Sequence, residues 1–236
     1  MFIAKHFAPI ADLGEVITEW FAIMRSKGAV MAGYHLMPAL GSPIGERVIV
    51  RNFGFPQEFA DSYDDPVFRA TDPIPAIVFE EGRPLSWSAA VANASFTPAQ
   101  RAFLAVCFHH GLVEGVSMPL YGPDGREGYL SLAFGHPISK LDMELTLQMQ
   151  AIAQSAHIRI AKLLEAEFLL HAKLSPRERE VLQWLARGKS TGDVATIMNL
   201  AADTVGTYTR RIYSKLGVND RIAAVVVGLT HGLVRF

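Results

Sequence analysis

Three basic side chains, Arg210, Arg211 and Lys215, lie close together in the segment DTVGTYTRRIYSKLG at residues 203–217. Guanidinium and ammonium groups neutralise phosphates and release their counterions, so a cluster of them is typical of nucleic-acid binding. Arg also pairs with guanine through two hydrogen bonds, which gives about 1 to 3 kcal/mol of discrimination between bases. The formal net charge of the chain is only −1, so this segment is a local concentration of positive charge.

The same segment has the spacing of an amphipathic helix. Its apolar residues recur at intervals of three or four and predict a buried side: Val205, Tyr208, Ile212 and Leu216. We predict that another side binds double-stranded DNA through the following residues: Thr204, Thr207, Arg210, Arg211 and Lys215. The alternative is a solvated basic face on an ordinary bundle helix.

Two further helices are expected before this one. The stretch LSPREREVLQWLARG (174–188) carries a helix start, with Ser175 as N-cap and Glu178 completing a capping box. A second helix is expected over about 190–200. A short helix, a tight turn and a helix with a basic front form the helix-turn-helix arrangement, whose second helix enters the major groove.

The charge of the chain is divided unevenly. Residues 171–236 contain ten Lys and Arg and five Asp and Glu, a net of +5, which leaves −6 for residues 1–170. This asymmetry suggests a sensor or catalytic domain that carries a nucleic-acid-binding domain. We expect one domain at 1–165, a linker at 166–173 and a second domain at 174–236.

Other residue types bear on the class of protein. A single cysteine, Cys107, excludes an internal disulfide framework. The first residues lack the apolar core of a secretory signal, and no apolar run is long enough for a membrane-spanning helix. We therefore expect a soluble cytoplasmic protein without a membrane partner.

The sequence contains neither of two common catalytic motifs, G-x-S-x-G and H-E-x-x-H. His109 and His110 are adjacent and point about 100° apart on a helix, which suits no metal. We expect no enzyme activity, no cofactor and no metal site.

The larger part of the chain mixes helix and strand signals. Apolar spacing predicts a helix over 10–26, and an N-cap followed by proline starts another over 97–111. The segments AVMAGYHLM and ERVIVRNFGF are predicted to be neighbouring strands, and two more strands flank a turn at 123–125.

A long helix is expected next, because residues 139–168 contain neither Gly nor Pro and carry an apolar stripe. The stripe either lies on the sheet of its own domain or also pairs with a second subunit. The predicted fold class is α+β: an N-terminal α/β/α sandwich with a mostly antiparallel sheet, joined to a C-terminal all-α domain of four helices.

The C-terminal residues resemble a known family. The stretch from Leu174 to Gly228 is similar to the LuxR-type helix-turn-helix domain, which has an L-[ST]-x-R-E-x-x-V-L opening and a recognition helix that ends in I-x-x-K-L. The resemblance implies DNA binding and pairing of two copies through the last helix. Three positions depart from the family, which commonly has Ser, Lys and His there: Ala201, Gly206 and Tyr208.

The N-terminal part resembles the autoinducer-binding domain of LuxR-type quorum-sensing regulators. That domain has an aromatic residue, a Tyr four residues on, an Asp-Pro nine further and a Trp fifteen further. In the stretch FGFPQEFADSYDDPVFRATDPIPAIVFEEGRPLSW these positions are Phe59, Tyr63, Asp72 and Trp87, and Gly115 also matches. The resemblance implies a transcription regulator that acts as a homodimer and binds a small autoinducer.

The implied ligand is an acyl-homoserine lactone. A buried Asp72 carboxylate can accept the amide N–H of this ligand, and Tyr63 can donate to its amide carbonyl. Trp87 supplies an apolar wall, and Ser131 adds a hydroxyl group.

Phe59 departs from the family, which usually has a Trp there whose indole N–H bonds the lactone carbonyl. A buried carbonyl without a donor weakens binding by about 1 to 3 kcal/mol, roughly 5- to 150-fold. Either another donor or water compensates, or the ligand is a different molecule, or the protein works without ligand. Two other functions stay open: a constitutive or protein-regulated factor whose pocket its own side chains fill, and a sandwich domain that retains a lactone-cleaving or other enzymatic activity.

Overall fold

The structure is a computed structural model that describes residues 6–37, 49–92, 94–112, 114–123, 126–134 and 143–235. The chain divides into two compact units, and the division along the last long helix falls between Ile160 and Ala161. The linker predicted at 166–173 is almost wholly helical, since α8 (Met143–Ala172) runs through it. The domain boundaries predicted from the sequence stay predictions.

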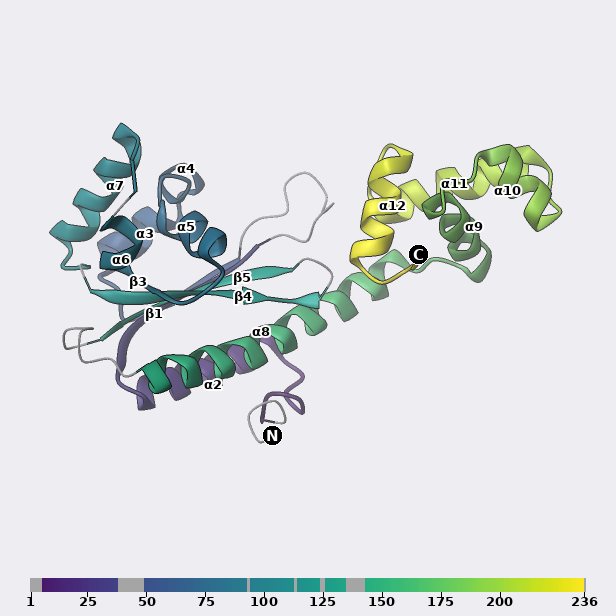
Figure 1. The fold of residues 1–236 in the computed structure, drawn as a ribbon. Coiled ribbons are helices and arrows are strands. Elements are labelled where there is room, and N and C mark those ends of the chain that lie inside the picture. The colour runs from purple at the N-terminus through teal and green to yellow at the C-terminus, as the bar shows by residue number, and fades with distance from the viewer. Residues whose placement is uncertain are drawn as a thin grey trace. The chain divides into compact units, whose positions relative to one another are not determined.

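The first unit is a three-layered sandwich. In chain order it contains α2 (Leu13–Ser26), β1 (Ala29–Leu36), β2 (Ile49–Phe53), α3 (Gln57–Asp64), α4 (Pro66–Arg69), α5 (Ile74–Glu81), β3 (Leu85–Ser86), α6 (Trp87–Ala92), α7 (Pro98–His109), β4 (Gly115–Tyr121), β5 (Glu127–Phe134) and the first part of α8. The strands form one antiparallel sheet in the order β2-β1-β5-β4-β3. Helices α2 and α8 cover one face, and α3 to α7 lie over the other (Figure 1). The predicted fold class is confirmed.

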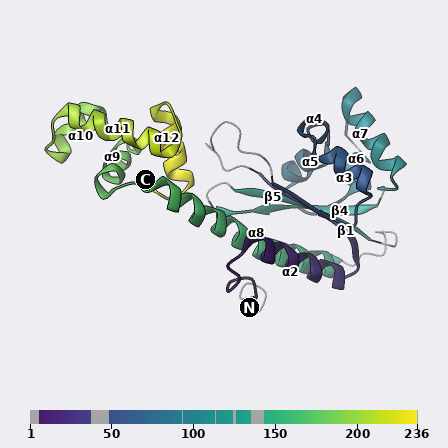
Figure 2. The same ribbon diagram turned by 180° about the vertical axis from the view of Figure 1, so that it is seen from behind.

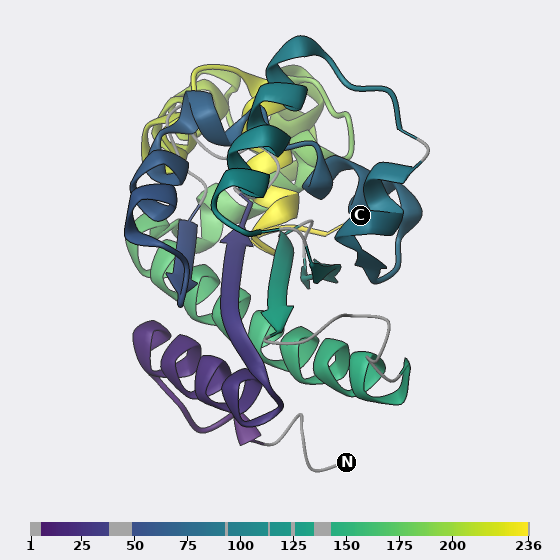
Figure 3. The ribbon, with the colours of Figure 1, turned by 90° about the vertical axis from the view of Figure 1, so that its left-hand side faces the viewer.

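Side chains of β1 alternate between the two faces of the sheet. The Tyr34 hydroxyl group lies 2.8 Å from Nδ1 of His157 on α8, and its ring packs edge-on against Trp20 of α2. Gly33 and His35 face the opposite side, as the period of a strand requires, and line a cavity there. Figures 2 and 3 show α2 beside the first turns of α8, beneath the strands. One face of the sheet is thus packed against α2 and α8, and a cavity lies over the other face.

The predicted helices over 10–26 and 97–111 are confirmed as α2 and α7, and α7 begins with a capping box between Thr97 and Gln100. The four predicted strands are found as β1, β2, β4 and β5, although Asp124 and Gly125 of the predicted turn lie outside the described residues. Helices α3 to α6 were not predicted. They are four to eight residues long, too short for a helical period to stand out.

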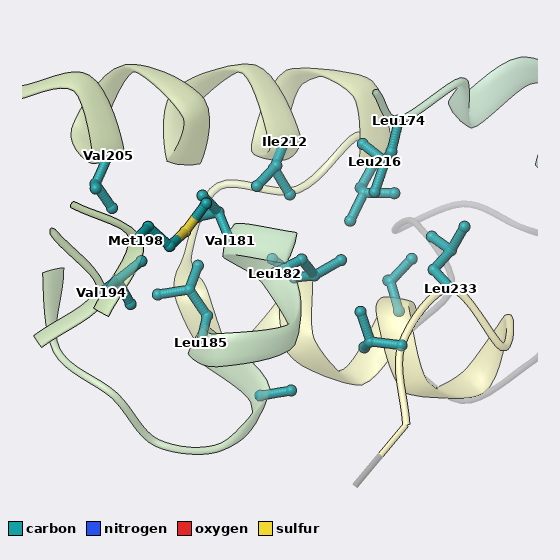
Figure 4. Packing of buried hydrophobic residues seen from close by; sticks show 14 of the residues in the cluster. Leu174, Val181, Leu182, Leu185, Val194, Met198, Val205, Ile212, Leu216 and Leu233 are labelled. Atoms are coloured by element: carbon teal, nitrogen blue, oxygen red, sulfur yellow. The ribbon is translucent and has the colours of Figure 1, made fainter. Parts of the chain in front are cut away.

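The second unit contains four short helices after the end of α8. They are α9 (Pro176–Ala186), α10 (Thr191–Met198), α11 (Ala202–Leu216) and α12 (Arg221–Thr230). Their apolar sides meet in one core, in which Leu182 of α9, Met198 of α10 and Ile212 of α11 are buried (Figure 4). The predicted capping box of Ser175 and Glu178 starts α9. The presence of α9, α10, α11 and α12 confirms the predicted C-terminal domain of four helices. None of the described helices has the length and apolar character needed to span a membrane.

Candidate functional site

A cavity of about 310 Å³ lies between the sheet and helices α3 to α7 of the first unit. All five side chains predicted to bind ligand line it: Phe59, Tyr63, Asp72, Trp87 and Ser131. Much of the remaining wall is apolar: Phe55, Ile74, Val91, Phe103, Leu104, Phe108 and Leu112. A mostly apolar cavity with a few polar groups has the composition of a small-molecule binding site.

Asp72 is the one carboxylate that lines the cavity among the described residues. Its Oδ2 accepts a hydrogen bond of 2.6 Å from the Tyr63 hydroxyl, and its Oδ1 accepts one of 2.9 Å from the backbone N–H of Ile74. Burial raises the pKa of Asp72 to about 6, against the lowering effect of these two hydrogen bonds. At pH 7 the group is therefore a fixed, mostly ionised acceptor.

Tyr63 lies where the sequence places it, at the cavity wall, but its hydroxyl is turned to another partner. The family resemblance implies that this hydroxyl donates to the amide carbonyl of the ligand, whereas in the structure it donates to Asp72. Burial and the neighbouring Asp72 charge raise the pKa of Tyr63 well above its ordinary value. Tyr63 therefore stays protonated and holds the carboxylate in place.

A second polar group is a hydrogen-bonded cluster on β4 and β5. The indole N–H of Trp87 donates to Ser117 Oγ at 2.9 Å, and Ser117 also bonds the hydroxyl groups of Tyr129 at 2.7 Å and Ser131 at 3.2 Å. Ser131 accepts from Ser117 and also hydrogen-bonds Tyr129, so the four side chains form one connected cluster. A side chain at Gly115 would collide with the Trp87 ring, so glycine there lets the indole lie against β4.

Phe59 stands in a cluster of aromatic rings and is 6% exposed. Its ring centroid lies 5.8 Å from that of Phe55, 5.6 Å from Tyr63 and 6.4 Å from Phe103. The position thus supplies apolar surface and no donor, as its residue type requires.

Cys107 also faces the cavity. Burial, with a contribution from the Asp72 charge, raises the pKa of its thiol to about 12. The thiol stays protonated and is a poor nucleophile at neutral pH. No group of three or more His, Cys, Asp or Glu among the described residues is placed to hold a metal ion.

Other polar side chains that line the cavity were not predicted from the sequence: His35, Asn52, Ser88 and Tyr129. Ser117, the centre of the hydrogen-bonded cluster on β4 and β5, was not predicted either. No motif marks them. The alternation of strands was the available signal, because Tyr129 lies two residues before Ser131 on β5 and pairs with His35 across the sheet.

Helix α11 carries the residues predicted to bind DNA. Arg210 and Arg211 are exposed, and Thr204 and Thr207 are partly buried. The Thr207 hydroxyl donates to the backbone carbonyl of Asp203 at 3.0 Å and accepts from Arg210 at 3.2 Å. Both guanidinium groups are therefore exposed on α11, on neighbouring positions that point about 100° apart.

Lys215 differs from the other four. Its ammonium group lies 2.6 Å from Glu178 Oε2 and also donates to the backbone carbonyl of Lys173. Burial acts to raise the pKa of Glu178, but hydrogen bonds from Lys215 and Ser175 outweigh it and lower that pKa below its ordinary value. The Glu178 side chain is 3% exposed, so Lys215 neutralises a buried charge at the start of α9.

The two units match two known families. Residues 12–160 match the family model of the autoinducer binding domain, and residues 172–227 match that of bacterial regulatory proteins of the luxR family. Together the two matches cover most of the chain.

Single proteins agree with this assignment. RpaR of Rhodopseudomonas palustris, a quorum sensing-dependent transcriptional regulator, is 31% identical over 206 residues, which cover 87% of this chain and 82% of the relative. A crystal structure of Escherichia coli SdiA shares the fold, with a TM-score of 0.78, 22% identity and coverage of 98% of this chain and 96% of that one. SdiA in complex with octanoyl-rac-glycerol gives a TM-score of 0.77 at 21% identity, over 99% and 94%. The relatives are transcriptional regulators and not enzymes.

Proposed function

The chain belongs to the LuxR-type autoinducer-binding transcriptional regulators of quorum sensing, and within this family we propose that it is controlled by an acyl-homoserine lactone and acts as a dimer. The first unit would bind the lactone and the second would bind an operator in double-stranded DNA. Ligand identity, dimerisation and the residues in contact with ligand and DNA are parts of this proposal.

One observation carries the choice of ligand: the Asp72 carboxylate, held by Tyr63 and Ile74 inside an otherwise apolar cavity. The two oxygens of this partly buried carboxylate each accept one hydrogen bond from the protein and can each accept a further one from a donor on the ligand. The amide N–H of an acyl-homoserine lactone is such a donor, and the Ser131 hydroxyl can donate to the adjacent amide carbonyl. The rings of Phe59, Trp87 and the other apolar walls would enclose the acyl chain.

A second candidate ligand is an acyl compound without a lactone ring. Phe59 favours this alternative, because it offers no donor to a lactone carbonyl. An open cavity of about 310 Å³ argues against a pocket filled by the protein's own side chains. The SdiA structure with octanoyl-rac-glycerol makes an acylglycerol a sensible compound to test.

DNA would be bound by α11, through Arg210, Arg211, Thr204 and Thr207. Two copies of α11 in a symmetric dimer would reach half-sites about one helical turn apart. We assign Lys215 chiefly to the contact with Glu178, since its ammonium group is already engaged there.

The test is thermal unfolding of protein expressed without lactone, with and without lactones of varied acyl chains and an acylglycerol. Free ligand at about 100 times its dissociation constant adds about 2.7 kcal/mol, a shift of several degrees. We expect a chain-length-selective shift that Asp72→Ala abolishes and Asp64→Ala, which changes an exposed carboxylate at the end of α3, leaves intact. A shift with the acylglycerol alone would favour the second candidate, and no shift with any compound would contradict ligand control.

A further inference from the structure

His35 is a buried polar side chain on the floor of the cavity that the proposed function does not use. It lies on β1, is 4% exposed and lines the cavity. Its ring is flanked by two tyrosine rings, with centroid distances of 5.2 Å to Tyr63 and 5.2 Å to Tyr129. Its position is therefore fixed from both sides.

Neither flanking tyrosine satisfies the imidazole. The Tyr63 hydroxyl donates to Asp72, and the Tyr129 hydroxyl bonds Ser117. Within the part of the chain that the structure describes, neither ring nitrogen of His35 has a hydrogen-bond partner. The residue lines the cavity and is otherwise enclosed, so a partner for the imidazole would come from the cavity.

The imidazole is neutral at physiological pH. Burial, with a further contribution from the charge of Arg69, lowers the pKa of His35 to about 3. A neutral imidazole offers one N–H donor and one acceptor nitrogen. A buried donor without a partner costs free energy, so a ligand that supplies an acceptor gains an advantage over one that does not.

We propose that His35 hydrogen-bonds a second oxygen atom of the ligand, outside the amide, and selects for ligands that carry an oxygen there. This inference rests on the proposed function, in which Asp72 and Ser131 take the amide. The His35 and Asp72 side chains both line the cavity and contact different ends of Tyr63, namely its ring and its hydroxyl, so we expect them to meet different parts of one ligand. Two oxygens fit: the lactone carbonyl, which Phe59 cannot bond, or a keto or hydroxyl group on the acyl chain.

The experiment is a cycle of protein variants and ligands measured by calorimetric titration. The ligands are an acyl-homoserine lactone, its 3-oxo derivative of equal chain length, and the N-acyl cyclopentylamine of that length, which lacks the lactone oxygens. The proteins are the wild type, His35→Leu, His35→Gln and the matched control His109→Leu, which changes an exposed histidine on α7 that is absent from the cavity lining.

We expect His35→Leu to weaken binding by about 5- to 150-fold for the ligand that has the recognised oxygen, and by little for the ligand without it. A loss confined to the 3-oxo ligand identifies the acyl oxygen. A loss with both lactones but not with the cyclopentylamine identifies the lactone carbonyl. His35→Gln, which keeps a donor and an acceptor, should restore part of the affinity, and His109→Leu should change nothing.

Cooperative unfolding of each variant without ligand shows that it folds, and His35→Gln serves if His35→Leu does not. Equal losses for all three ligands, or no loss, with an intact wild-type affinity would overturn the role of His35 and leave the proposed function standing. Failure of the wild type to bind any of the compounds would overturn the proposed function, and this inference with it.

Discussion

Single residues in the cavity differ sharply in the pH range over which they titrate. The pKa of Asp72 is raised to about 6, whereas burial lowers that of His35 to about 3 and raises that of Cys107 to about 12. The pKa values of Tyr63 and Tyr129 are also raised by burial. Between pH 5 and 7, Asp72 is therefore the one titratable side chain described along the cavity lining that changes its charge.

This separation predicts the pH dependence of ligand binding. An ionised carboxylate accepts a stronger hydrogen bond from an amide N–H than a protonated one does. Affinity for an acyl-homoserine lactone should thus fall about tenfold as the pH is lowered from 7 to 5, as protonation of Asp72 competes with the ligand. Titration calorimetry across this range measures the effect, and Asp72→Asn should bind more weakly with a flat profile. A flat profile in the wild type would contradict direct contact between the ligand and the carboxylate.

The unliganded protein should show the opposite trend. Because the folded-state pKa of Asp72 lies above its ordinary value of 3.8, the folded state binds the proton more tightly than the unfolded state does. The contribution of Asp72 to stability is therefore greatest at low pH and declines as the pH rises from about 4 to 6. Ligand binding and stability thus respond to the same proton with opposite sign.

At the level of elements, α11 separates residues that hold the helix from residues that face outward. Lys215 pairs with the buried Glu178 and so joins the end of α11 to the start of α9. Arg211 is exposed on the same helix. Among the described residues, its side chain forms no hydrogen bond or ion pair with the second unit. Similar charges on one helix are thus expected to have different functions.

Substitution of each cation by Met tests this difference. Lys215→Met leaves Glu178 with a missing partner and should lower the free energy of unfolding by about 1 to 3 kcal/mol. Arg211→Met should change stability by less than about 0.5 kcal/mol but weaken DNA binding and reduce its dependence on salt. Urea unfolding and DNA titrations at several salt concentrations measure the two effects. Equal stability losses in both variants would contradict the assignment.

Elements with strong local signals were predictable, and the others were not. The N-cap and capping-box residues at Thr97 and Ser175 predict helices α7 and α9. The periodic apolar residues predict α11. Helices α3 to α6 span too few turns for an apolar period to show, although α4 has a start signal in Asp65 as N-cap followed by Pro66. The spacing typical of the family nevertheless predicted Tyr63, Asp72 and Trp87 as ligand-binding residues. Tyr63 lies on α3, Asp72 just before α5 and Trp87 on α6. Hydrogen-bond partners such as Ser117 arise from strand pairing, which local sequence does not fix.

At the level of the whole molecule, function requires that the two units affect each other. A ligand shifts the affinity for DNA only if it binds two states of the protein differently. This coupling is reciprocal for equilibrium binding, so an operator must change the affinity for the ligand by the same factor. The proposed function therefore requires that ligand and operator change each other's affinity for the intact chain by equal factors.

This requirement can be tested on full-length protein with an operator selected from random DNA. If the lactone raises operator affinity, for example tenfold, a saturating operator must raise lactone affinity tenfold, about 1.4 kcal/mol in each direction. Arg211→Met should weaken operator binding while leaving lactone affinity without DNA unchanged, and Asp72→Asn should do the converse. Sedimentation of the same samples reports whether two chains occupy each operator, as half-sites about one helical turn apart require. A lactone that binds tightly but leaves operator affinity and chain number unchanged would be a ligand of the cavity without being the signal that controls DNA binding.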